Sequence, residues 1–67
     1  MVIERRTIEA LERASFALER IVADLYAEMD RAVDEGNYND ASLLQSQADL
    51  LYGVVENLET VLAEQEE

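Results

Sequence analysis

Apolar residues recur at alternating spacings of three and four through most of this 67-residue chain. This heptad pattern gives an α-helix one apolar side along its whole length and is typical of helices that pack lengthwise against each other. The chain has no proline, which would interrupt such a helix. The pattern breaks once, around the single stretch EGNY. We therefore predict an all-α fold, a single helical hairpin with one helix over residues 3–35, a turn at 36–37 and a second helix over residues 38–64.

Heptad positions a and d of the predicted first helix hold small or apolar residues for four successive heptads. They are Ile8, Leu11, Ser15, Leu18, Val22, Leu25, Met29 and Ala32. Ser15 is the polar exception, and because small residues that face a core usually serve packing, we predict that it packs rather than binds. Charged residues occupy the other side of the helix, where we expect ion pairs four residues apart such as Glu9 with Arg13 and Arg20 with Asp24.

The predicted second helix has a wider apolar arc than the first. Its a and d positions are Ala41, Leu44, Ala48, Leu51, Val55, Leu58 and Leu62, and the arc is extended by Leu43, Leu50, Val54 and Val61. A stripe this wide exceeds what one neighbouring helix can cover. Gly53 costs about 1 kcal/mol in an exposed helix relative to alanine, so we expect it to mark the close approach of another helix, with a kink as the alternative.

The stretch between the helices has the residues of a tight connection. Gly36 suits the left-handed position that ends a helix, and Asn37 suits the N-cap of the next one, with Asn39 as the alternative cap. A connection this short makes the two helices antiparallel neighbours. We expect Tyr38 to pack across this turn.

The other aromatic residues fall at the edges of the apolar seams. Tyr26 and Tyr52 occupy e positions, where a phenol ring can be half-buried with its hydroxyl in water. Phe16 falls at b, where we expect it in solvent. The alternative is that Phe16 belongs to a second contact surface beside Ile3, Ala23 and Ala27.

A chain of this length buries only about 60 % of the surface that its unfolded form exposes, so it is marginally stable alone. It has no cysteine and no histidine, which leaves oligomerisation as the expected source of further stability. We predict a homodimer in which two hairpins form a four-helix bundle. The predicted dimer or partner interface consists of Leu11, Leu18, Val22, Leu25, Leu43, Leu44, Leu50, Leu51, Val54, Val55, Leu58, Val61 and Leu62, with Gly36, Asn37 and Tyr38 forming the turn.

The formal net charge is −11, from sixteen acidic residues and five arginines, and residues 36–67 contain no basic residue. Such a balance disfavours direct binding to nucleic acid or to an anionic membrane, both of which need basic side chains. A basic or apolar protein partner fits better, and the alternative to a self-association module is an acidic regulator that occupies a basic, nucleic-acid-binding surface. No apolar run is long enough to span a membrane. The opening residues meet charge before a signal peptide could form, so we expect a cytoplasmic location.

Residues on both sides of the turn follow the pattern of a known hairpin: Met29, Ala32, Tyr38, Ala41, Ser42 and Leu44. In this spacing the stretch from Ile21 to Leu51 resembles the UVR motif, a short helical hairpin of the excision-repair proteins UvrB and UvrC. The resemblance implies a protein–protein docking hairpin that can self-associate, and no catalysis. The chain departs from that motif at Gly36 and Asn39, and at Gln45 and Ser46 it lacks the Arg-Asp pair of the motif.

The sequence offers little for catalysis. Its serines and threonines lack a histidine or lysine that would act as a base. Two carboxylate pairs spaced three apart, Glu9 with Glu12 and Glu56 with Glu59, have the spacing of helical metal ligands, but the heptad register points both pairs outward. We therefore predict no enzyme activity, no metal and no cofactor, with a carboxylate metal or nucleotide site as the least favoured alternative.

Overall fold

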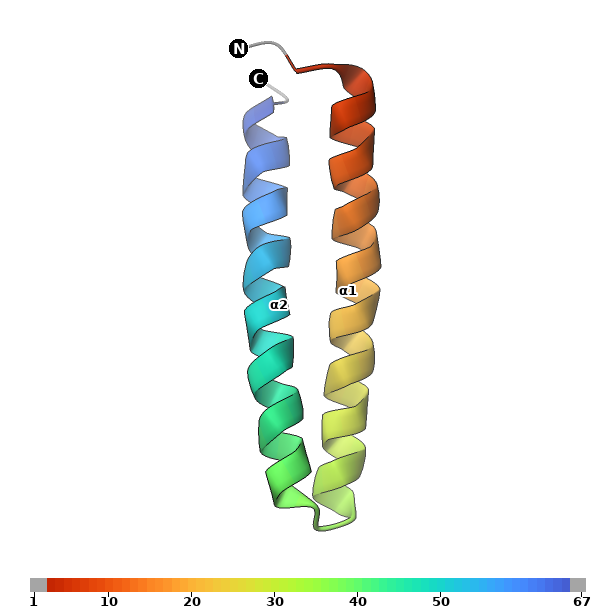
Figure 1. The fold of residues 1–67 in the computed structure, drawn as a ribbon, viewed down its shortest axis with the longest axis vertical. Coiled ribbons are helices and arrows are strands. Elements are labelled where there is room, and N and C mark those ends of the chain that lie inside the picture. Colours follow the sequence, from red (N-terminus) through yellow and green to blue (C-terminus); the bar gives the residue numbers. More distant parts are fainter. Residues whose placement is uncertain (1–2, 66–67) are drawn as a thin grey trace.

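The computed structural model describes residues 3–65, which form two α-helices joined by a short turn. Helix α1 spans Arg5–Asp34 and helix α2 spans Tyr38–Gln65. The helices lie side by side and antiparallel, so the start of α1 and the end of α2 are at the same end of the rod (Figure 1). The predicted all-α hairpin is confirmed. Relative to the predicted bounds, α1 begins two residues later and ends one earlier, and α2 ends one residue later.

The turn closes α1 with a Schellman motif. Gly36 has a φ of 81°, the left-handed conformation that glycine adopts most readily. Its N–H donates to the Val33 carbonyl over 3.0 Å, and the Asn37 N–H donates to the Ala32 carbonyl over 2.8 Å. The Asn37 carbonyl then accepts the first hydrogen bond of α2, from the Ala41 N–H. The predicted left-handed conformation of Gly36 is thus confirmed, and Asn37 directly precedes α2, at the predicted N-cap position.

The interface between the helices follows the predicted a and d positions but buries mainly small side chains. The buried residues are Ser15, Val22, Ala32, Ala41, Ala48 and Val55. Seven leucines at d or a positions remain half-buried, namely Leu11, Leu18, Leu25, Leu44, Leu51, Leu58 and Leu62. In residues 3–65 no large side chain is fully buried. Helix pairing therefore accounts for the small residues of the seam and leaves the leucines partly covered.

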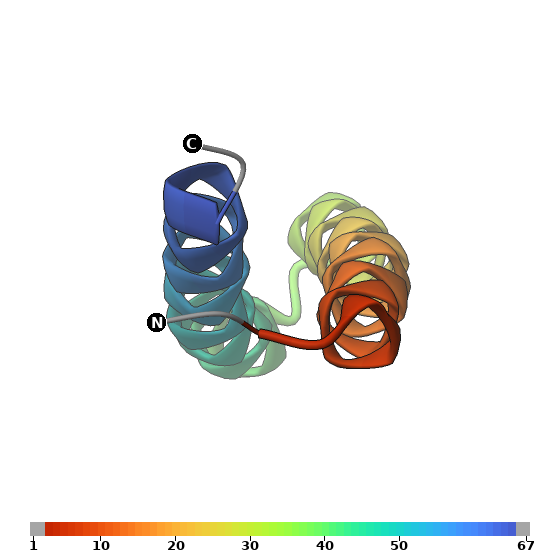
Figure 2. The same cartoon turned by 90° about the horizontal axis from the view of Figure 1, so that it is seen from above.

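The hairpin is an elongated single layer. Its Cα atoms extend over 50 × 14 × 13 Å, with a radius of gyration of 15.3 Å. A compact domain of this length has a radius of gyration of about 11 Å. Viewed from one end, the two helices stand as a pair with both broad sides of the layer uncovered (Figure 2). The fold thus has one helix–helix seam and two open sides.

The prediction that Tyr38 packs across the turn is wrong, and the close approach predicted at Gly53 does not occur within this hairpin. Tyr38 is 68 % exposed, so it does not pack across the turn. A Cβ placed on Gly53 would meet nothing within 4 Å, so α1 does not approach it closely. Gly53 lies within the continuous helix Tyr38–Gln65, on the side of α2 that faces away from α1. Ser15, in contrast, is only 6 % exposed, in agreement with a packing role.

Candidate interaction surfaces

The first open side of the hairpin carries exposed aliphatic residues from both helices. Leu43, Leu50 and Val54 of α2 are 63 %, 67 % and 46 % exposed, and Ile21 of α1 is 46 % exposed. Leu43 and Leu50 are one heptad apart, and Val54 follows Leu50 by one turn, so the three lie along one stripe. We call these four residues and the half-buried Leu18, Leu25, Leu51, Leu58 and Val61 beside them the leucine–valine face.

The predicted interface residues divide into three groups. Val22 and Val55 are 4 % and 3 % exposed and lie in the interior of the hairpin. Eight are half-buried: Leu11, Leu18, Leu25, Leu44, Leu51, Leu58, Val61 and Leu62. Leu43, Leu50 and Val54 are exposed. The two valines are thus used by the hairpin itself, and the other residues retain area that a second molecule can cover. The turn residues Gly36, Asn37 and Tyr38 are all exposed.

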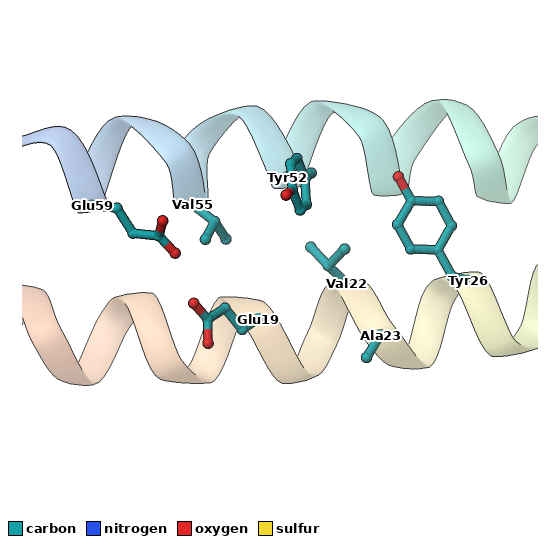
Figure 3. Close-up of a pocket in the computed structure, with 7 residues that line it drawn as sticks. All are labelled: Glu19, Val22, Ala23, Tyr26, Tyr52, Val55 and Glu59. Carbon is teal, nitrogen blue, oxygen red and sulfur yellow. The ribbon is translucent and has the colours of Figure 1, made fainter.

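The second open side holds a groove of about 320 Å³ between the helices. Seven residues line it, and we call it the tyrosine–glutamate groove: Glu19, Val22, Ala23, Tyr26, Tyr52, Val55 and Glu59. The two valines point into the gap between the helices, and the tyrosines and glutamates come from both helices (Figure 3). Successive helical residues are about 100° apart around the axis. Glu19 and Ile21, or Tyr52 and Val54, therefore point to opposite sides of the hairpin, so the groove and the leucine–valine face are on different sides.

A hydrogen bond joins the two helices at one end of the groove. The Tyr26 hydroxyl on α1 donates to Oδ1 of Asp49 on α2 over 2.5 Å. This bond raises the pKa of Tyr26 above its usual 10.0, with smaller contributions from desolvation and from the negative charge of Asp49. The position of Tyr26 at the edge of the seam was predicted, but its partner was not. Asp49 lies at a b position, and only the stagger between the helices brings it within reach.

Two carboxyl groups face each other at the other end of the groove. Glu19 of α1 and Glu59 of α2 point toward one another across the gap between the helices (Figure 3). The pKa of Glu59 is raised, first because its protonated carboxyl shares a hydrogen bond with Glu19, then through desolvation and repulsion between the charges. Glu59 is exposed, as the heptad register predicts, but it faces Glu19 across the groove instead of pointing away from α1 with Glu56. In an antiparallel hairpin, e positions of the two helices meet along one side, and Glu59 is such a position.

A smaller hollow of about 130 Å³ lies beside the turn. It is lined by Glu28, Arg31, Ala32, Glu35, Asn37, Asp40 and Leu44. Arg31 pairs with Glu28, and this hydrogen bond, together with the charges of Glu28 and Glu35, raises the pKa of Arg31. An arginine in the last turn of α1 also complements the helix dipole. The positive charge of Arg31 is thus already paired, and it stabilises the end of α1.

The remaining ion pairs lie near the start of α1. Arg5 pairs with Glu9 at 3.4 Å and Arg6 with Glu4 at 3.1 Å. Glu9 thus pairs with the residue one turn before it, not with the predicted Arg13, and within residues 3–65 the predicted pair of Arg20 and Asp24 does not form within 4 Å. All of these side chains are exposed, so the pairs contribute little to stability.

Neither a metal site nor a membrane span emerges from the described part of the chain. Within residues 3–65 no three side chains of the metal-ligating types come together. The carboxylate pairs Glu9 with Glu12 and Glu56 with Glu59 therefore gain no third ligand from the other helix. Neither α1 nor α2 has a stretch long and apolar enough to cross a membrane.

Comparison of the chain with protein-family models, with curated proteins and with solved structures finds no match.

Proposed function

We propose that two copies of the hairpin pair through the leucine–valine face into a four-helix bundle, and that the protein is a non-enzymatic self-association module. The observation that carries this proposal is the exposure of large aliphatic residues along one side. Leu43 and Leu50 are more than half exposed, and the leucines of the seam are only half-buried. A contiguous apolar side of this kind is typical of a surface that another protein covers.

The surface area of the hairpin supports the same proposal. The chain exposes 5247 Å², whereas a compact folded monomer of 7.6 kDa exposes about 4,300 Å² by the scaling of surface with mass. The difference of about 950 Å² is close to the 800 Å² or so that each partner buries in a protein interface of standard size. One interface per hairpin would therefore bring the exposed surface to the value expected of a compact fold.

A second copy of this chain is a suitable partner for geometric reasons. A two-fold symmetric dimer places the same patch against itself, and a stripe of uncharged leucine and valine side chains is compatible with such self-contact. Two hairpins stacked by their leucine–valine faces give four helices around one core, the arrangement of a four-helix bundle. The resemblance to the UVR motif agrees with this proposal, since it implies a docking hairpin that can self-associate.

Light scattering coupled to gel filtration tests the proposal. We expect a mass of twice 7.6 kDa at micromolar concentration, falling toward the monomer on dilution. Analytical ultracentrifugation over a concentration series would give the dissociation constant. A folded, helical monomer at every concentration would contradict the proposal.

The distribution of charge favours a second candidate function, that of an acidic regulator which occupies a basic surface of another protein. The described part of α2 contains acidic residues and no basic one, and within residues 3–65 the ion pairs engage only Glu4, Glu9 and Glu28. Most carboxylates are thus left to attract a basic partner. Such binding would weaken steeply with ionic strength. Affinity unchanged between low and high salt would argue against this function.

A further inference from the structure

The tyrosine–glutamate groove holds two carboxyl groups that lack a cation. Glu19 and Glu59 point toward each other, and their proximity raises the pKa of Glu59. In residues 3–65 the ion pairs engage Arg5, Arg6 and Arg31, and none of these reaches either carboxylate. A positive charge placed between Glu19 and Glu59 would relieve their repulsion.

The rest of the groove suits the remainder of a long cationic side chain. Its floor is formed by the methyl groups of Val22 and Val55, which are nearly covered by the helix seam. Tyr26 and Tyr52 come from opposite helices and form its other end, with Tyr52 51 % exposed (Figure 3). An aliphatic stem can pack on such a floor while its charged end reaches the carboxylates. Aromatic rings nearby favour a cation further.

Among cations, these features favour a guanidinium group. A guanidinium is planar, stacks on aromatic rings and donates paired hydrogen bonds to carboxylates, whereas an ammonium is a compact and strongly hydrated charge. A divalent metal ion would need further oxygen ligands, and no third metal-ligating side chain joins Glu19 and Glu59 in the described part of the chain. The volume of about 320 Å³ is at the small end for ligand sites, which fits one side chain rather than a large cofactor.

We infer that the tyrosine–glutamate groove binds an arginine side chain presented by a partner protein, with the guanidinium between Glu19 and Glu59 and the stem over Val22 and Val55. Charge complementarity identifies the occupant, since the chain is strongly acidic and the groove contains two carboxylates without a cation. The inference goes beyond self-association and does not rest on it. The groove and the leucine–valine face lie on opposite sides, so a dimer leaves both of its grooves open.

Titration with a small arginine probe tests this binding directly. The probe is N-acetyl-arginine amide, and its matched control is N-acetyl-citrulline amide, which has the same shape without the charge. We expect saturable changes in the NMR shifts of the Val22 and Val55 methyl groups and of the Tyr52 ring with the arginine probe. The citrulline probe should bind at least tenfold more weakly, and N-acetyl-lysine amide should also bind more weakly than arginine.

Two double variants with the same net charge separate the groove from general electrostatic attraction. Glu19→Gln/Glu59→Gln should weaken arginine binding at least tenfold. Glu12→Gln/Glu56→Gln, which removes one carboxylate from each helix outside the groove, should retain the affinity within twofold. Tyr52→Phe should bind nearly as well as the parent protein, and Tyr52→Ala should bind more weakly because the ring is lost. Circular dichroism checks that each variant keeps its fold, and its mass in solution checks that it keeps its oligomeric state.

Equal affinity for the arginine and citrulline probes, or no saturable shift at all, would overturn the inference. Equal losses of affinity in the two double variants would also overturn it. So would NMR shifts at Tyr52 and Val55 that change with protein concentration, together with loss of probe binding as that concentration rises. The last outcome would mean that a second copy occupies the groove. The self-association proposal is judged separately by mass, so a monomer that binds arginine would contradict only that proposal. A dimer that does not bind arginine would contradict only this one.

Discussion

Tyr26 of α1 donates a hydrogen bond to Asp49 of α2, a residue 23 positions further along the chain. It lies on the exposed edge of the seam, beside the groove. The interior contains no comparable polar link, since Ser15 is the only buried polar residue in residues 3–65. The relative position of the helices along their axes is therefore set by apolar packing, by the turn and by this edge contact.

The Tyr26 phenol should titrate above pH 10.0, the usual pKa of a tyrosine. The hydrogen bond to Asp49 raises its pKa above 10.0 in the folded state, so the folded protein holds this proton more tightly than the unfolded chain does. The resulting stability is fully present below pH 10 and is lost as the pH rises through the raised pKa. Ultraviolet titration of tyrosinate, compared between the parent protein and Tyr26→Phe, measures this. If Tyr26→Phe left the part of the titration curve above pH 10 unchanged, the raised pKa of Tyr26 would be contradicted.

Glu59→Gln should stabilise the protein at neutral pH. The pKa of Glu59 is raised above 4.5 in the folded state, mainly by its hydrogen bond with Glu19, the acidic group that faces it from α1. A raised carboxyl pKa contributes stability that is fully present below pH 4.5 and is lost as the pH rises through the folded-state pKa. The amide of glutamine stays neutral at every pH, so the variant keeps this stability at neutral pH.

Thermal melts of the parent protein and of Glu59→Gln between pH 3 and pH 8 measure this difference. The gain in melting temperature should be largest near neutral pH and should shrink as the pH falls below 4.5. Glu56→Gln, three residues away and outside the groove, is the matched control and should show a smaller gain. Equal gains for both variants would show that net charge, not the Glu19–Glu59 contact, controls the effect.

The helices, the turn and the seam could be predicted because each follows from local rules. Alternation of three and four residues places Leu18 and Val22 on one side of a helix wherever that helix lies. Gly36 marks the turn because few other residues adopt its left-handed conformation readily. These features depend on neighbours within a few residues, which the sequence shows directly.

The groove could not be predicted in the same way because it depends on the stagger between the helices. Glu19 and Tyr26 are one heptad apart, as are Tyr52 and Glu59, and all four are e positions. An antiparallel hairpin brings such positions together along one side, so this matched spacing is the signal that would have located the groove. Sequence spacing alone groups Glu59 with Glu56 of its own helix, because it does not show which residues of the other helix lie opposite.

Gly36→Ala and Gly53→Ala should change stability in opposite directions. Gly36 has a φ of 81°, where an alanine side chain is strained, so we expect a loss of about 1–2 kcal/mol. Gly53 is helical, and a methyl group there meets nothing within 4 Å. Its replacement should stabilise the helix by about 1 kcal/mol, which corresponds to about 4–8 °C in melting temperature for a chain of this size.

Thermal and urea unfolding of both glycine variants checks these values. Each variant serves as a control for the other, because both add the same methyl group. A loss of stability for Gly53→Ala that grows with protein concentration would mean that a helix of another molecule packs closely at Gly53. The close approach of another helix to Gly53 would then occur between molecules.

Leu51→Asp should unfold the hairpin or dissociate its dimer. Leu51 is a half-buried d residue that faces the seam and also belongs to the leucine–valine face. A carboxylate there is costly to desolvate when α1 or a second copy covers it. Circular dichroism with light scattering detects either result, and a variant that remained a helical dimer would show that the heptad register is wrong.

Leu50→Glu should separate the dimer without unfolding the hairpin. Leu50 is 67 % exposed, so its replacement leaves the seam between α1 and α2 intact. Burying a leucine contributes about 1.5–3 kcal/mol, and a two-fold symmetric dimer contains the residue twice, so the loss should be about 3 kcal/mol or more. This corresponds to a dissociation constant at least about 100-fold higher. Sedimentation equilibrium of the parent protein and the variant measures the change, with circular dichroism as the check on helicity.

Phe16→Glu is the matched control for Leu50→Glu. Phe16 is 66 % exposed, nearly the same as Leu50, and the substitution adds the same charge. It lies two residues before Leu18 and so points about 200° away from the leucine–valine face. We expect Phe16→Glu to dimerise like the parent protein. If Phe16→Glu dissociated the dimer and Leu50→Glu did not, the two hairpins would pair through the side that carries Phe16, and the leucine–valine face would be free for a different apolar partner.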